Sequence, residues 1–102
     1  MELPTKEERH EIYIRAKEIY KLEAPYTGMC VSIIKAWKNI PTFGDPLHQN
    51  MPGYGWLVNT AFPEMAKIKP KEEHLRDNRY WWSKDHIEKR IKKFDEIIKM
   101  TE

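Results

Sequence analysis

The sequence predicts a mainly α-helical fold: a single small domain of three to four helices over residues 1–102, with a long loop rich in glycine and proline. Apolar residues recur at helical spacing in three separate stretches. Capping-box patterns precede the first and the last of these stretches. Hydrophobic residues make up 40% of the 102-residue chain, which is enough for one modest core and excludes a disordered polypeptide.

The first predicted helix covers residues 6–23. Thr5 and Glu8 have the spacing of a capping box, and Pro25 stops the helix. Ile12, Ala16 and Ile19 fall on one face with Tyr13 and Tyr20 beside them, while Glu8, Arg15, Lys17 and Glu18 point outward.

The second predicted helix covers residues 29–39, with Thr27 or Gly28 as its cap. Its β-branched residues leave a strand possible, but the spacing of Trp37 favours a helix. Because its apolar face is nearly continuous, we expect it to run through the centre of the domain, antiparallel to the first helix. The apolar face comprises Met29, Cys30, Ile33, Ile34 and Trp37, where Cys30 is expected to be a small core residue rather than a nucleophile.

Residues 41–55 form the predicted loop, which holds three of the four glycines and three of the seven prolines. Its large apolar side chains indicate a functional or packed loop. Residues 56–62 are predicted as a short helix, with a strand as the alternative, and Pro63 opens another turn through Ala66. Residues 67–78 are expected to form a solvated connection, with one helical turn at 72–75.

The last predicted helix begins after Ser83 or Asp85, because Asp85 and Glu88 repeat the capping-box spacing. Its predicted buried stripe consists of Ile87, Ile91, Phe94 and Ile98.

The stretch from Arg76 to Lys84 carries three consecutive aromatics between arginines and a lysine. Guanidinium groups pair with phosphates and indoles stack on bases, so the stretch suits a nucleotide. It is equally compatible with aromatics that close the end of the core, with Arg79 stacked on one of them. Arg90 is either an ordinary surface residue or one whose guanidinium reaches the start of the last helix. The candidate ligand-binding residues are Tyr54, Trp56, Trp81 and Trp82 for stacking, and Arg76, Arg79, Lys84 and Arg90 for phosphate.

Several function classes are disfavoured. A net charge of +2 argues against binding of long nucleic acid as the main role. The four histidines, one cysteine and the carboxylates show no metal-ligand spacing, so we expect no metal, no cofactor and no catalytic residues. No apolar run approaches the roughly 20 residues that cross a bilayer. The first residues lack the layout of a secretory signal, and we expect a cytoplasmic protein.

Three short motifs resemble a widespread group of small uncharacterised proteins encoded by bacteriophages. They are Gly28-Met29-Cys30, Phe62-Pro63-Glu64 and Tyr80-Trp81-Trp82, followed by Arg90 in the last helix. The resemblance implies an accessory protein made in the cytoplasm of an infected bacterium. Some small phage proteins sequester nucleotide immune signals such as cyclic dinucleotides or ADP-ribose derivatives, and the analogy rests on size and on aromatic and basic residues.

We therefore expect non-catalytic sequestration of a small nucleotide-like anion by a homo-oligomer that counters host defence. The alternative is an adaptor or inhibitor that binds a host protein through its aromatic surface. A phosphodiesterase, which would form product, and a sequence-independent nucleic-acid binder, whose affinity would fall steeply with salt, rank lower.

Overall fold

The computed structural model describes residues 3–24, 28–39, 54–68 and 84–102, and for residues 54–57 and 86 the description is limited to the backbone. This part of the chain is helical and contains no strand. The helices are α1 (Lys6–Glu23), α2 (Met29–Lys38), α3 (Tyr54–Ala61), α4 (Pro63–Lys67) and α6 (Lys84–Met100). The predicted mainly α-helical fold is confirmed, and the predicted glycine- and proline-rich loop falls largely outside the described residues.

Helix α1 begins with the predicted capping box. The Thr5 hydroxyl accepts from the Glu8 amide at 3.2 Å, and the Glu8 carboxylate accepts from the Thr5 amide at 3.0 Å. These two bonds satisfy amides that have no partner within the helix. The predicted bounds of residues 6–23 match the helix in the structure.

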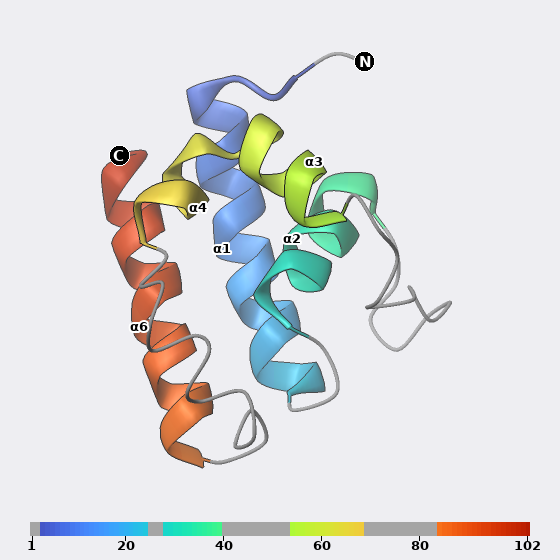
Figure 1. The fold of residues 1–102 in the computed structure, drawn as a ribbon. Coiled ribbons are helices and arrows are strands. Elements are labelled where there is room, and N and C mark those ends of the chain that lie inside the picture. The colour runs from blue at the N-terminus through green and yellow to red at the C-terminus, as the bar shows by residue number, and fades with distance from the viewer. Residues whose placement is uncertain (1–2, 25–27, 40–53, 69–83) are drawn as a thin grey trace.

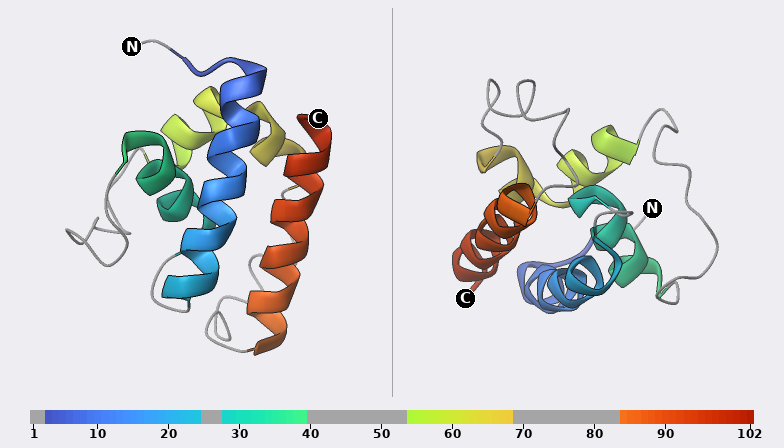
Figure 2. Two further views of the ribbon diagram at one scale, coloured as in Figure 1. Left: turned by 180° about the vertical axis from the view of Figure 1, so that it is seen from behind. Right: turned by 90° about the horizontal axis from the view of Figure 1, so that it is seen from below.

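Helices α1 and α6 lie side by side and antiparallel (Figures 1 and 2). Lys17 near the middle of α1 pairs with Asp95 at 2.6 Å, so Lys17 does not point freely outward as predicted. The Tyr20 and Phe94 rings pack with centroids 5.6 Å apart. In α6 the most deeply buried side chains are Phe94 and Ile97, whereas the predicted Ile98 is only partly buried. The buried stripe therefore lies slightly to one side of the predicted one.

Helix α2 packs against the other side of α1 and runs back toward the end at which α1 begins, inclined to it, so the predicted helical hairpin is present (Figure 1). Seven of its ten residues are buried, including Ile33 and Ile34 in the core. It ends at Lys38, one residue before the predicted end, and is followed by the cap residue Asn39, whose φ of 56° is the left-handed conformation common just after helices. The central position predicted from its apolar face is confirmed, although the buried Lys35 was not foreseen.

The short helices α3 and α4 cross the end of the bundle at which α1 begins (Figure 1). Phe62 separates them and is fully buried, with the Tyr13 ring at 5.6 Å and the Trp37 ring edge-on at 5.3 Å. Pro63 opens α4 at a position where a missing amide hydrogen costs nothing. The short helix predicted for residues 56–62 is present as Tyr54–Ala61, so it begins within the predicted loop and ends before Phe62. The turn predicted after Pro63 is present as α4.

The five helices of the described residues all contribute to one hydrophobic cluster. It consists of Ile12, Tyr13, Ala16, Tyr20, Met29, Ile33, Ile34, Ala36, Val58, Ala61, Phe62, Met65, Ile68, Phe94 and Ile97. Cys30 and Trp37 are partly buried against it, in keeping with the structural role predicted for Cys30.

Candidate functional site

Half of the predicted ligand-binding residues lie outside the described residues: Arg76, Arg79, Trp81 and Trp82. The other four belong to two helices. Tyr54 and Trp56 are in the first turn of α3, where only the backbone is described, and Lys84 and Arg90 are in the first two turns of α6. The predicted turn at residues 72–75 and the Ser83 cap also lie outside the described residues.

The structure does not bring these two groups together. Helix α3 lies at the end of the bundle where α1 begins, whereas α6 begins at the end where α1 finishes (Figures 1 and 2). Lys84 and Arg90 follow the stretch 76–83 closely in the sequence. They are therefore the described part of one candidate site. Tyr54 and Trp56 belong to a different region of the same chain.

Lys84 and Arg90 differ in their surroundings. Lys84 is exposed at the first position of α6, while Arg90 is partly buried. Arg90 precedes Phe94 by four residues, so both lie on the side of α6 that faces α1. Arg90 is thus a partly buried residue on this side of α6, and both interpretations of it, as an ordinary surface arginine and as one that reaches the helix start, stay predictions.

Tyr20 faces Arg90 from α1, and it was not among the predicted site residues. Its side chain is 2% exposed, and its ring contacts Phe94 at 5.6 Å. Burial raises the pKa of the Tyr20 phenol, and the positive charge of Arg90 partly offsets that rise. The sequence marked Tyr20 as a core residue, but only the antiparallel packing of α1 on α6 places it beside a guanidinium group.

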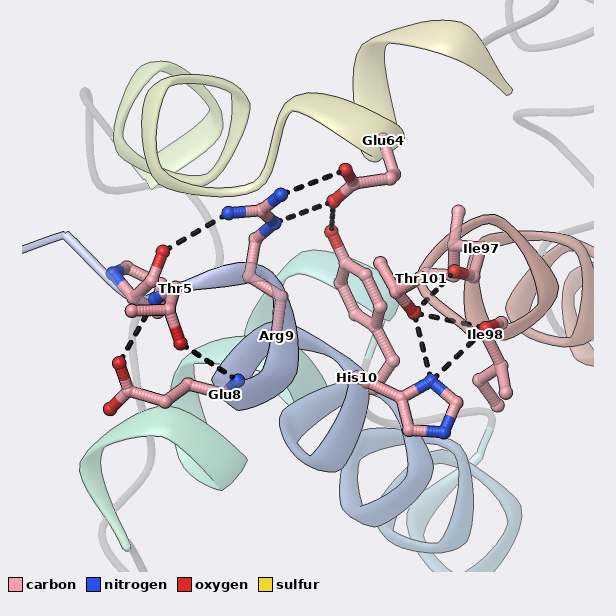
Figure 3. Close-up of polar contacts among 10 residues, drawn as sticks. Thr5, Glu8, Arg9, His10, Glu64, Ile97, Ile98 and Thr101 are labelled. Carbon is pink, nitrogen blue, oxygen red and sulfur yellow. Dashed lines mark hydrogen bonds and ion pairs between the residues drawn. The ribbon is translucent and has the colours of Figure 1, made fainter.

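At the opposite end of α1, a charged network joins α1 to α4 (Figure 3). The Arg9 guanidinium donates to both oxygens of the Glu64 carboxylate, at 2.8 and 3.1 Å, and to the Pro4 carbonyl at 3.1 Å. The fully buried Tyr13 donates its hydroxyl proton to Glu64 at 2.8 Å. We call this network of Arg9, Glu64 and Tyr13 the Arg9–Glu64 clasp. Both donors engage the Glu64 carboxylate, so the clasp holds α1 and α4 together and Glu64 is not a free base.

The protonation states in this clasp follow from its geometry. Burial raises the pKa of the Glu64 carboxyl, but the hydrogen bonds from Arg9 and Tyr13 and the charge of Arg9 outweigh it, so the net pKa is lowered. Burial, followed by the bond to Glu64, raises the pKa of the Tyr13 phenol well above its usual range. Glu64 was noted in the sequence only as part of the Phe-Pro-Glu motif, because nothing in the linear order pairs it with Arg9.

His10 links α1 to the end of α6. Its Nδ1 atom lies 3.1 Å from the Ile98 carbonyl and 3.0 Å from the Thr101 hydroxyl (Figure 3). Because a carbonyl oxygen only accepts, Nδ1 carries the proton in this arrangement. The Thr101 hydroxyl in turn donates to the carbonyls at the end of α6. This histidine therefore fastens two helix ends.

Metal binding and membrane insertion find no support in the described residues. No group of three or more histidine, cysteine, aspartate or glutamate side chains there is arranged to hold a metal ion. None of the described helices combines the length and the apolar character required to cross a bilayer.

Comparison of the chain with protein-family models, with curated proteins and with solved structures gives no match.

Proposed function

We propose that this protein binds and sequesters a nucleotide-derived anionic signalling molecule without converting it chemically. The observation that carries the proposal is the order of residues in the sequence from Arg76 to Arg90. Aromatic and basic residues run directly into α6, whose first two turns present the exposed Lys84 and the partly buried Arg90. In the setting implied by the resemblance to phage proteins, the bound molecule is a host immune signal.

Electrostatics favour this end of α6 for an anion. The first turns of a helix carry partial positive charge. In the first two turns of α6 the three cations Lys84, Lys89 and Arg90 outnumber the two carboxylates Asp85 and Glu88. A partly buried guanidinium is less screened by salt and loses less conformational freedom on binding than an exposed lysine. Arg90 is accordingly the cation on which we expect affinity to depend most.

Tyr54 and Trp56 lie too far from Lys84 and Arg90 to share a site with them within one subunit. Because α3 lies at the other end of α1, these residues contribute to the same ligand only across a contact between subunits (Figure 1). We therefore propose a homo-oligomer, which light scattering after size-exclusion chromatography measures directly. If the protein is a monomer, the ligand site is confined to the end of the domain that carries Lys84 and Arg90.

The test is a thermal-shift panel of AMP, ADP-ribose, cyclic mononucleotides and cyclic dinucleotides. A ligand that binds only the folded state raises the melting temperature. We expect at least one compound to do so, with a smaller rise in Arg90→Ala and Lys84→Ala. Lys92→Ala is the matched control, since Lys92 is an exposed lysine of the same helix. Full recovery of the unchanged nucleotide separates sequestration from phosphodiester cleavage.

A second candidate is an adaptor that binds a host protein. Two large apolar side chains of α1 favour it, because Leu22 is 63% and Ile14 is 39% exposed. Contiguous exposed apolar patches mark protein interfaces, and this candidate requires Leu22 and Ile14 to belong to one. If the protein is an adaptor, no nucleotide of the panel should raise its melting temperature. Leu22→Ser should then abolish binding of the partner protein.

A further inference from the structure

The hydroxyl of Tyr20 is buried without a hydrogen bond in the described part of the protein. The side chain is 2% exposed, and its ring packs at a tilt against Phe94. Tyr13, seven residues earlier on the same helix, provides the internal comparison. It is equally buried, but its hydroxyl donates to Glu64 at 2.8 Å. Two tyrosines two turns apart therefore differ in whether their polar atom is satisfied.

An unsatisfied buried hydroxyl lowers stability, because the group loses water and gains no partner. Phenylalanine would fill the same space without this cost. Such a group in a folded protein requires an explanation, and one explanation is a bound ligand or ion that completes its hydrogen bonding. The surroundings of Tyr20 indicate which kind of ligand would do so.

The neighbouring charged group is Arg90. It lies one turn before Phe94 on the side of α6 that packs against α1, close enough for its charge to act on the Tyr20 phenol. Arg90 has no carboxylate partner among the described residues, in contrast to Arg9, which is held by Glu64. The phenol and the guanidinium thus present hydrogen-bond donors with no acceptor assigned to either.

We propose that the Tyr20 hydroxyl and the Arg90 guanidinium jointly bind one phosphate group of the ligand, which makes Tyr20 a binding residue as well as a core residue. The inference rests on the proposed function and names the part of the ligand that this site takes. A phosphate oxygen accepts from the phenol while others accept from the guanidinium. Phe94, whose ring packs on Tyr20, belongs to the hydrophobic cluster, and Ile87 and Ile91 of the same helix pack against it. Apolar surroundings of this kind strengthen hydrogen bonds to a charged group.

The experiment compares Tyr20→Phe with Tyr13→Phe, because each removes a single buried hydroxyl from α1. Affinity is measured by calorimetry for AMP, ADP-ribose and cyclic di-GMP, with adenosine as the phosphate-free comparator and inorganic phosphate as the base-free one. Melting temperatures are recorded without ligand. We expect Tyr20→Phe to melt at or above the wild-type temperature and to bind phosphate-containing nucleotides about tenfold more weakly, the loss of one charged-group hydrogen bond.

Tyr13→Phe should show the reverse pattern. Its melting temperature falls, because Glu64 loses a donor, while its nucleotide affinity stays at the wild-type value. A probe that binds Tyr20→Phe as tightly as wild type would overturn the assignment of Tyr20 and leave the proposed function standing. A large fall in the melting temperature of Tyr20→Phe would also overturn it, since the hydroxyl would then be satisfied within the protein. If no probe stabilises the wild-type protein, the proposed function itself fails, and the phosphate site fails with it.

Discussion

The Lys35 ammonium and the Glu23 carboxylate form an ion pair of 2.7 Å inside the protein, with side chains only 5% and 3% exposed. The pair joins the middle of α2 to the last residue of α1. Both charges have lost most of their water, so each depends on the other for its solvation. Helix α2, which buries a nearly continuous apolar face, is therefore also fastened to α1 by a charged contact.

Replacing Lys35 with methionine should destabilise the protein strongly. The substitution keeps an unbranched side chain, one atom shorter, but leaves the Glu23 charge buried without this partner, for which about 3–5 kcal/mol is the usual cost. Urea unfolding followed by circular dichroism measures the change in the free energy of unfolding. Lys21→Met is the control, because Lys21 and Glu18 form an exposed pair at 3.9 Å. That change should stay within about 0.5 kcal/mol, and equal losses in the two variants would contradict the structural importance of the buried pair.

The Arg9–Glu64 clasp should make stability depend on acid pH. The pKa of Glu64 is lowered in the folded state from its ordinary value of 4.5. Its contribution is therefore fully present above about pH 4.5 and is lost as the pH falls through the folded pKa. The free energy of unfolding, measured from pH 7 down to pH 3, should decrease in this range.

Glu64→Gln tests the origin of that decrease. The variant should be less stable than wild type by about 1–3 kcal/mol at pH 7, since a charged hydrogen-bond acceptor is lost, and the difference should narrow toward pH 3. Glu8→Gln is needed beside it, because the capping box also lowers the pKa of Glu8 and acts in the same pH range. A wild-type acid dependence that persists unchanged in Glu64→Gln would exclude the clasp as its source.

The capping box at the start of α1 should contribute measurably to stability. Thr5→Ala removes the oxygen that accepts from the Glu8 amide, and a lost N-cap costs about 1 kcal/mol. Thr5→Ser retains the hydroxyl and should stay close to wild type. Thermal unfolding of the three proteins distinguishes the outcomes, and similar losses for alanine and serine would attribute the effect to the threonine methyl group instead.

Tyr13 and Tyr20 should resist ionisation in alkaline solution. Burial raises the pKa of both phenols above the ordinary value of 10, and for Tyr13 the bond to Glu64 adds to the rise. Because the folded-state pKa is raised, the associated stability is present below about pH 10 and is lost as the pH increases. The ultraviolet absorbance of phenolate should show these two residues ionising only together with unfolding. Early titration of all five tyrosines of the chain in the folded protein would contradict their burial.

The positions of the helices are determined by short stretches of the sequence. The Thr5 capping box, the apolar spacing around Ile33 and the proline after Phe62 each act over a few residues, and the structure has α1, α2, α3 and α4 where these signals predicted them. The signals suffice because helix periodicity and capping depend only on neighbours within one or two turns. The candidate cations Lys84 and Arg90 were likewise evident from their position at the start of the last helix.

The pairing of side chains across helices was decided by tertiary packing alone. Lys35 meets Glu23, Arg9 meets Glu64, and Tyr20 comes to lie near Arg90 only because α1 packs antiparallel against both α2 and α6. Periodicity assigns a residue to a face of its own helix, but it carries no information about the register of one helix against another. The separation of Tyr54 and Trp56 from Lys84 and Arg90 has the same cause, since the place of α3 at the far end of α1 follows from how Phe62 and Val58 fill the shared core.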